Sequence, residues 1–277
     1  MTYQNQVAIV TGASSGIGHA TALALARKGA RVVAVARRQP LLDDLIGLCR
    51  PFSPDSFAIS GDLAERAFAE NLVDLTEDRC GRVDILVNNA GISCHQSALS
   101  LTPEDADLVM RVNFMAPMWT TLRALPAFLR AGGGTIVNVS SFAAKVCPPR
   151  EGIYAASKAA LNAFTAGLWS DLEGTGIHAG IVNPGPIDTP IWERQAHEEP
   201  AGFSGHKFPP EVVTRAILEV IEKRVREVTA PRGNPQLVSA HLLRLVAPGL
   251  LLRGMAQMEP VAPETIEAAR EQALRRL

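Results

Sequence analysis

The sequence predicts an α/β fold in which a doubly wound parallel sheet of about seven strands carries helices on both faces. The first observation is a repeated alternation between short runs rich in β-branched residues and longer stretches with helical patterning. The second is the start of the chain, where an apolar run at 6–11 is followed by a glycine-rich turn and a helical stretch at 19–28. The third is size, because 277 residues with 47% hydrophobic composition suffice for one domain spanning residues 1–277.

The remaining elements follow the same pattern along the chain. Further strands are expected at 31–36, 56–60, 83–87, 135–141, 177–183 and 225–230, and helices at 64–79, 103–130, 210–225 and from 154 onward. The expected strands are short and apolar, as is typical of a parallel sheet covered on both faces. Thr102 followed by Pro103 marks the start of the longest helix.

Composition argues against several functional classes. The formal net charge is −1, so the chain lacks the basic surplus expected for a nucleic-acid or anionic-lipid partner. Four cysteines stand apart at 49, 80, 94 and 147, without a CxxC pair or a His/Cys cluster at metal spacing. Isolated cysteines fit a reducing compartment, and the first residues lack the pattern of a signal peptide. We therefore expect a cytoplasmic protein with no metal site.

The turn after the first strand carries glycines at three positions that matter for nucleotide binding. Gly12 allows a tight turn, Gly16 lets the backbone approach a pyrophosphate, and Gly18 allows the helix to pack closely on the strand. The N-terminus of the following helix offers free N–H groups and a partial positive charge to phosphates. A plain glycine-rich loop is the alternative, but its place between strand and helix predicts a Rossmann-like dinucleotide-binding unit.

A second constellation combines Ser141, Tyr154 and Lys158. Tyr154 and Lys158 are four residues apart, so they share one face of the expected helix. An ammonium beside a phenol favours the phenolate and lowers the tyrosine pKa, which would let Tyr154 exchange a proton near neutral pH. Ser141 ends the preceding strand, where its hydroxyl could bond the same substrate oxygen. Ser140 would face the opposite side of a continuing strand.

These motifs together resemble the short-chain dehydrogenase/reductase family. The matching segments are TGASSGIG at 11–18, NNAG at 88–91, the Tyr154–Lys158 pair and the proline-glycine motif at 184–185, and the resemblance covers about residues 6–230. It implies hydride transfer between a nicotinamide and a ketone or secondary alcohol, with Tyr154 as general acid/base and Ser141 polarising the carbonyl. It also gives Lys158 a bond to the nicotinamide ribose. Asn113, in a matching Val-Asn context, would bend its helix and hold a water for proton relay.

The resemblance also assigns cofactor contacts. They are Gly12, Ser14, Ser15, Gly16, Ile17, Gly18, Arg37, Arg38, Asp62, Leu63, Asn89, Ala90, Gly91, Tyr154, Lys158, Pro184, Gly185, Ile187 and Thr189. Ala36, Arg37 and Arg38 end the second strand without a carboxylate, which favours NADP(H) with Arg37 as the main 2′-phosphate contact. NAD(H) is the alternative cofactor, and the arginines would then be solvated surface charge. Asp62 could hold the adenine, cap the helix at 64–79, or do both.

Substrate contacts are expected from Ser141, Tyr154, Cys94, Cys147, Ile191 and Trp192. The two cysteines are interpreted as inert packing in the pocket wall. The aperiodic stretch at 190–210 is expected to form a substrate lid. Lid and tail point to a bulky, apolar carbonyl or alcohol substrate.

The C-terminal extension at 233–277 lies largely outside the resemblance. Its Leu-rich part at 237–258 is interrupted by His241, Arg244, Pro248 and Arg253, so it predicts two short amphipathic helices instead of a membrane span. Three interpretations remain open: part of an apolar substrate pocket, a subunit contact, or a membrane-surface patch, the last being the least favoured. Family members commonly form dimers or tetramers through the helices that here hold Asn113 and Tyr154.

Two other functional classes stay open beside the oxidoreductase. One is an NADP(H)-binding sensor without turnover, although a sensor has no need of a positioned proton donor. The other is an epimerase or dehydratase, against which the spacing of the glycine turn and the lack of a second C-terminal domain argue. The preferred prediction is an NADP(H)-dependent oxidoreductase without a metal.

Overall fold

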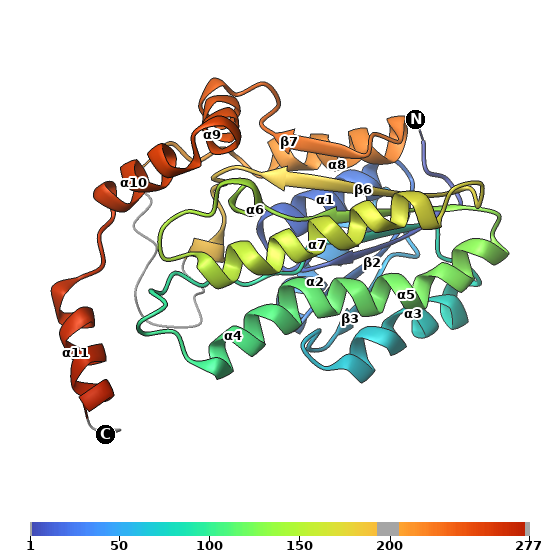
Figure 1. Ribbon diagram of the computed structural model, residues 1–277. Helices are drawn as coiled ribbons and strands as arrows, with labels where there is room; N and C mark the ends of the chain where they lie inside the picture. Colours follow the sequence, from blue (N-terminus) through green and yellow to red (C-terminus); the bar gives the residue numbers. More distant parts are fainter. Residues whose placement is uncertain (1, 193–204, 275–277) are drawn as a thin grey trace.

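Seven parallel strands form the centre of the protein in the spatial order β3-β2-β1-β4-β5-β6-β7 (Figure 1). The computed structural model describes residues 2–192 and 205–274. The strands are β1 (Val7–Thr11), β2 (Arg31–Ala36), β3 (Phe57–Ser60), β4 (Ile85–Asn88), β5 (Gly134–Val139), β6 (Ile177–Pro184) and β7 (Glu227–Ala230). The predicted doubly wound sheet of about seven strands is confirmed.

The order of the strands reverses between β1 and β4. From β1 the chain winds outward through β2 to β3, then returns to β4 and winds the other way to β7. Val10 pairs in parallel with Ala34 of β2 and with Val87 of β4, so the carboxyl ends of all three strands lie at one edge of the sheet. In open α/β sheets the crevice at such a switch point is where ligands bind.

Helices cover both faces of the sheet and enclose two separate cores. The face with α1 (Gly16–Arg27), α2 (Gln39–Cys49) and α8 (Glu211–Lys223) buries Ala8 and Val10. The opposite face, with α3 (Arg66–Cys80), α5 (Ala116–Arg130) and α7 (Gly152–Asp171), buries Val7 and Ile9. Successive residues of β1 thus point to opposite cores, which explains why the whole strand is apolar.

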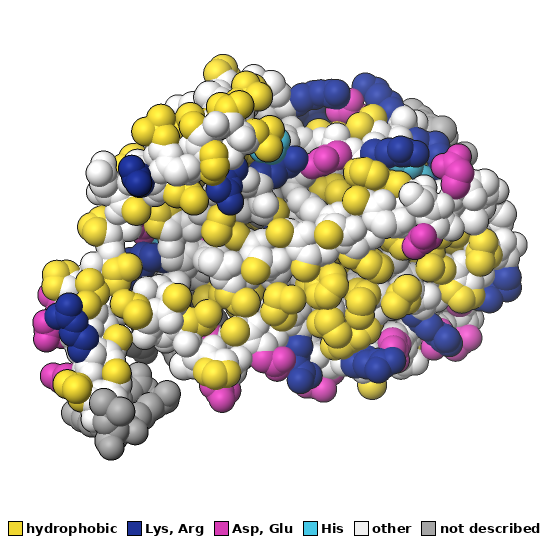
Figure 2. All heavy atoms as spheres, viewed as in Figure 1, with side chains coloured by type: hydrophobic (Ala, Val, Ile, Leu, Met, Phe, Trp, Pro, Cys, Tyr) yellow, Lys and Arg dark blue, Asp and Glu magenta, His cyan; other side chains and the backbone are white. Residues whose placement is uncertain are grey.

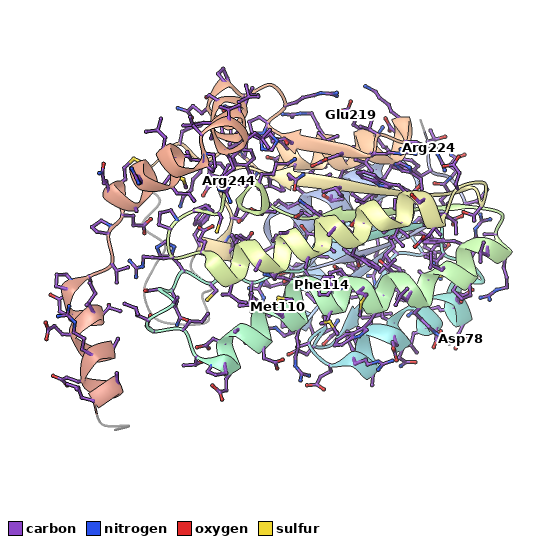
Figure 3. All side chains as sticks on the ribbon, in the orientation of Figure 1. Asp78, Met110, Phe114, Glu219, Arg224 and Arg244 are labelled. Atoms are coloured by element: carbon purple, nitrogen blue, oxygen red, sulfur yellow. The ribbon has the colours of Figure 1, made fainter. Side chains whose placement is uncertain are left out.

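The predicted helix at 103–130 is continuous but changes its winding in the middle. It comprises α4 (Pro103–Met110), a π-helical segment η1 (Arg111–Met115) and α5. Thr102 caps α4 because its Oγ1 accepts a hydrogen bond from the Asp105 N–H at 3.1 Å. Phe114 of η1 lies beside α7 and meets the Phe164 ring edge-on, with centroids 6.3 Å apart (Figure 3). The irregular turn contains Asn113, the residue expected to bend the helix.

The C-terminal extension is helical. The two expected short helices are α9 (Pro235–Val246) and α10 (Pro248–Met258), and a third, α11 (Pro263–Leu274), projects away from the sheet (Figure 1). Two short elements, α6 (Ala143–Val146) and η2 (Pro190–Trp192), complete the described structure. No helix in residues 2–192 or 205–274 is long and apolar enough to cross a membrane. Most of the expected lid at 190–210 lies outside the described residues.

Candidate active site

A cavity of about 1090 Å³ opens at the carboxyl ends of the central strands. Its wall includes the expected cofactor residues Gly12, Ser14, Ser15, Gly16, Ile17, Arg37, Arg38, Asp62, Leu63, Asn89, Ala90, Gly91, Tyr154, Lys158, Pro184, Gly185, Ile187 and Thr189. The expected substrate residues Ser141, Ile191 and Trp192 line the same cavity. The structure therefore gathers residues from β1 to η2 around one space, as parallel topology requires.

The glycine turn leaves no room for side chains. A Cβ on Gly18 would lie 2.4 Å from the carbonyl oxygen of Gly12, so α1 packs directly against the turn. Gly12 has a φ of +67° and Gly16 a φ of +55°, which L side chains rarely adopt, and a Cβ on Gly16 would meet Thr189 Cγ2 at 2.9 Å. Because α1 begins at Gly16, its first N–H groups lie beside the cavity. This bare backbone at a helix N-terminus fits the pyrophosphate of a nicotinamide dinucleotide.

Hydrogen bonds tie the NNAG segment to the glycine turn. Thr11 Oγ1 accepts from the backbone N–H groups of Asn89 and Ala90 at 2.9 and 3.0 Å. The Asn89 amide donates to the Thr11 carbonyl at 2.9 Å. Asn88 is buried beneath them and donates to Asn138 Oδ1 of β5 at 2.9 Å. The adjacent asparagines therefore join β1, β4 and β5 at the edge where the cavity opens.

The two arginines after β2 occupy different surroundings. Arg38 donates to Ser14 Oγ at 2.7 Å and to Ser15 Oγ at 3.3 Å, so it is held beside the glycine turn. Arg37 is more exposed and forms an ion pair with Asp62 at 3.8 Å. The expected helix cap at Asp62 is wrong, because Asp62 Oδ1 accepts from the Ala64 N–H within a turn and α3 starts only at Arg66.

Ser141 and Tyr154 meet in the cavity, where their side chains form a hydrogen bond. Ser141 Oγ also accepts from the Ala143 N–H at 3.1 Å, which fixes its position at the start of α6. Ser140 also contributes to the cavity wall, but its hydroxyl is taken up by α7, where it donates to the Lys158 carbonyl at 3.0 Å. Lys158 is buried one helical turn beyond Tyr154, and its ammonium donates to the Val139 carbonyl at 2.9 Å.

The pKa values of this pair differ from the sequence expectation. Burial raises the pKa of Tyr154 to about 12, although its hydrogen bond with Ser141 acts in the opposite direction and the Glu151 carboxyl adds to the rise. Burial also lowers the pKa of Lys158 to about 8. The expected lowering of the Tyr154 pKa by Lys158 is therefore not seen here, because the removal of the phenol from water dominates the shift.

Asn113 links the π-helical turn to the loop after β4. Its Oδ1 accepts from the Ile92 N–H at 2.9 Å, and its Nδ2 donates to the Ile92 carbonyl and to Ser157 Oγ at 3.0 and 3.1 Å. A Cβ on Gly91 would lie 3.2 Å from Asn113 Oδ1 and 3.4 Å from Lys158 Nζ. Asn113 thus lies behind the cavity wall with its carbonyl oxygen near the lysine, and its role in a proton relay stays a prediction.

Cys94 and Cys147 are not among the residues that line the cavity, contrary to expectation. Cys94 is buried with its Sγ 3.7 Å from Gln96 Oε1, and burial raises the pKa of its thiol. Cys147 is exposed, so it does not pack in the wall as expected. Their neighbours in the chain, including Ser93 and Val146, face the cavity instead. In these loops the direction of each side chain depends on backbone turns that the sequence does not reveal.

The cavity wall also contains residues that the sequence analysis missed. They are chiefly apolar side chains from α4, α9 and α10 together with two titratable groups near Tyr154: Leu108, Leu237, Leu251, Met255, Met258, His95 and Glu151. The three-residue spacing between Glu151 and Tyr154 was a usable signal, since it places both on one helix face. Nothing in the local sequence marks His95.

No group of three His, Cys, Asp or Glu side chains that could hold a metal ion occurs among the residues that the structure describes. The polar groups that line the cavity include hydroxyl, phenol, ammonium, guanidinium, imidazole and carboxyl side chains, together with backbone groups of the glycine turn.

Comparisons with known proteins agree with this geometry. A family model described as short chain dehydrogenase matches residues 6–200. A short chain dehydrogenase of Pseudocercospora fijiensis is 38% identical over 191 residues, covering 68% of this chain but only 62% of the relative. The chain thus spans less than two thirds of that relative's length.

Two solved structures have the same fold. A short-chain dehydrogenase from Streptomyces avermitilis has a TM-score of 0.77 at 28% identity, covering 91% of this chain and 96% of the other. A metagenomic short-chain oxidoreductase in complex with NADP has a TM-score of 0.71 at 26% identity, covering 83% of this chain and 98% of the other. On the matched family model, the fold and the arrangement of the site, this chain belongs to the short-chain dehydrogenase family.

Proposed function

We propose that the protein is an NADP(H)-dependent oxidoreductase that interconverts a ketone and a secondary alcohol. The observation that carries the proposal is the placement of Tyr154, Ser141 and Lys158 in the same cavity as the glycine cradle at Gly12–Gly18. A dinucleotide held by the cradle can thereby share one space with a substrate carbonyl. Bound NADPH supplies the hydride that carbonyl reduction requires.

The protein's own groups handle the proton and the developing negative charge. The Tyr154 phenol, with a pKa of about 12, is protonated at neutral pH and donates its proton to the substrate oxygen. The Ser141 hydroxyl donates a hydrogen bond to the same oxygen and holds the carbonyl against Tyr154. Lys158, with a pKa of about 8, is mostly charged at pH 7 and stabilises the phenolate that remains.

The end of β2 supports NADP(H) over NAD(H). Arg38 lies within hydrogen-bond distance of Ser14 and Ser15, and Arg37 is next to Asp62, so two guanidinium groups flank the cavity. An arginine can bind a 2′-phosphate through two parallel hydrogen bonds, whereas a carboxylate there would repel it. The structural relative in complex with NADP agrees with this preference.

The substrate end of the cavity supports a bulky, apolar compound. Leu237 of α9 and Leu251, Met255 and Met258 in or at the end of α10 all face the cavity. We therefore assign the C-terminal extension to the substrate pocket, which is one of the three interpretations that the sequence left open. Flexible methionine side chains can adapt to several substrate shapes.

We also propose that the protein forms a homodimer or homotetramer through α5 and α7. Figure 2 shows hydrophobic side chains gathered over α5 and alongside α7. Leu122 and Leu129 of α5 are 49% and 55% exposed. A continuous apolar surface of this kind is typical of a subunit contact.

The four free cysteines of the protein agree with a reducing, cytoplasmic environment.

The proposed activity is tested by following NADPH and NADH oxidation against a panel of ketones and aldehydes of increasing size and polarity. We expect turnover with NADPH on large apolar ketones and weaker turnover with NADH. If the protein binds NADPH tightly but is inactive on every carbonyl and every alcohol, it is an NADP(H) sensor and the oxidoreductase proposal is wrong. Preference for small charged carbonyls would overturn the substrate class.

A further inference from the structure

Three titratable side chains from distant parts of the chain meet at the cavity wall near Tyr154. His95 lies in the loop after β4, Glu151 is the residue before α7, and Glu259 follows α10. All three line the cavity. His95 Nε2 is 2.5 Å from Glu259 Oε1, and His95 Nδ1 is 4.0 Å from Glu151 Oε1. The C-terminal extension thus completes a polar patch in a wall that is otherwise largely apolar.

One polar atom of this patch has an unused hydrogen-bonding position. His95 is only 5% exposed, and its Nδ1 is buried without a hydrogen bond to any described residue. Buried polar atoms are nearly always hydrogen-bonded, so the position calls for a ligand or a water. The 4.0 Å gap to Glu151 is too long for a direct hydrogen bond. A single oxygen that lies to one side of the line joining the two atoms can be about 2.8 Å from each, which is an ordinary hydrogen-bond distance.

The patch lies within reach of the reacting group. Glu151 lies immediately before α7, and Tyr154 follows it by three residues in the first turn of that helix. The two side chains are close enough for the Glu151 carboxyl to raise the pKa of Tyr154. A molecule whose carbonyl meets Tyr154 and Ser141 can therefore extend a second group to His95 and Glu151.

The charges around the patch select a neutral group. Arg150 Nη1 lies 4.0 Å from Glu259 Oε1, so a guanidinium stands near the same carboxylates. A carboxylate on the ligand would be repelled by Glu151 and Glu259, while an ammonium would find Glu259 already paired with His95 and Arg150. A hydroxyl avoids the repulsion and can donate to one partner while it accepts from the other. Burial and the neighbouring Glu259 raise the pKa of Glu151 to about 7, so its carboxyl can serve in either role near neutral pH.

We propose that His95 and Glu151, with His95 held by Glu259, form a subsite that binds a hydroxyl group of the substrate. The substrate is accordingly a largely apolar ketone that carries a second, remote hydroxyl. This inference rests on the proposed oxidoreductase function and refines its substrate class. His95 and Glu151 act as specificity residues that position the far end of the substrate, while Tyr154 and Ser141 act at the carbonyl.

The test uses pairs of fused-ring ketones that share one carbon skeleton and differ only in a hydroxyl remote from the carbonyl. With NADPH, we expect kcat/KM to be about tenfold or more higher for the hydroxylated member of the best pair, mainly through KM, as one charge-assisted hydrogen bond would give. Glu151→Leu and, independently, His95→Phe are expected to bring this ratio close to one. Glu264→Gln, an exposed change in the same C-terminal extension, is the matched control and should keep the wild-type ratio.

A ratio near one for every pair in the wild type, or a ratio that both variants leave unchanged, would overturn the subsite and leave it a position for water. Thermal-shift measurements with NADPH present test the subsite separately from turnover, so they remain informative if the oxidoreductase proposal fails. The hydroxylated compound should then raise Tm more than its partner, and the excess should disappear in Glu151→Leu and His95→Phe. Equal shifts for both members of each pair would overturn the subsite even without turnover.

Discussion

Replacing Arg38 or Arg37 by glutamine is expected to weaken NADPH without weakening NADH. Glutamine keeps most of the side chain's length and polarity but removes the positive charge that a 2′-phosphate requires. A hydrogen bond between charged partners contributes roughly 1.5–3 kcal/mol, which corresponds to a change in Kd of about 10- to 150-fold. Arg38 is held by Ser14 at 2.7 Å, so the loss of NADPH affinity on its replacement should fall well inside this range. Arg37, the main phosphate contact expected from the sequence, is 65% exposed, so solvent screening should limit its effect to about tenfold and make it the weaker of the two.

The measurement is the Kd of NADPH and of NADH for each variant, followed by quenching of intrinsic fluorescence or by calorimetry. Because the phosphate contact is electrostatic, the NADPH affinity of the wild type should also fall as salt rises, and more steeply than that of the variants. Arg66→Gln, on the exposed start of α3, is the matched control because its ion pair with Glu70 lies outside the cavity wall. If both variants at the end of β2 keep the wild-type ratio of NADPH to NADH affinity, the basis for NADP(H) preference is refuted.

Three further predictions concern stability and exposure. Asn88→Ala should lower the free energy of unfolding by about 2–4 kcal/mol in urea titrations, because it removes the donor to Asn138 and leaves buried polar groups unpaired; a loss below about 0.5 kcal/mol would contradict it. Since the pKa of Glu151 is about 7 in the folded protein against 4.5 ordinarily, the folded state binds more protons between these values. Stability should therefore fall by up to about 3 kcal/mol as pH rises through that window. Glu151→Gln should flatten this part of the stability profile, and an unchanged slope would count against it. In the native protein Cys147 should react with a thiol reagent before the buried Cys49, and the reverse order would show that their exposure is misassigned.

The sheet and its nucleotide edge could be predicted because their signals are local. The central strand β1 is buried on both faces, and the glycines of the turn at 12–18 are required by contacts within that turn and with its neighbours. By contrast, α2 was not among the expected helices, and its sequence contains Pro40 and Gly47, which are unfavourable inside a helix. In the structure Pro40 lies in the first helical turn, where proline is tolerated, and Leu42 and Leu45 pack in the core. Burial of the apolar face of α2 therefore outweighs the low helix propensity of Pro40 and Gly47.

The substrate end could not be predicted because its contacts join distant segments. His95 and Glu259 are 164 residues apart in the chain, and their 2.5 Å contact follows from the path of α9 and α10 over the cavity. The direction of Cys94 and Cys147 depends on irregular loops, where no periodicity indicates which side chain faces inward. The pKa of Tyr154 was misjudged for a related reason: spacing reveals the neighbouring Lys158 but not the extent of burial.

The most direct test of the proposed mechanism is the single-turnover rate of NADPH oxidation by Tyr154→Phe, measured beside its NADPH affinity. Phenylalanine keeps the ring in the cavity and removes only the hydroxyl that we assign as the proton donor. We predict that NADPH binding stays within a few-fold of the wild type while the rate on the best ketone falls by about 10²- to 10⁴-fold. A rate within a few-fold of the wild type, with NADPH still bound, would contradict the assignment of Tyr154 as the proton donor.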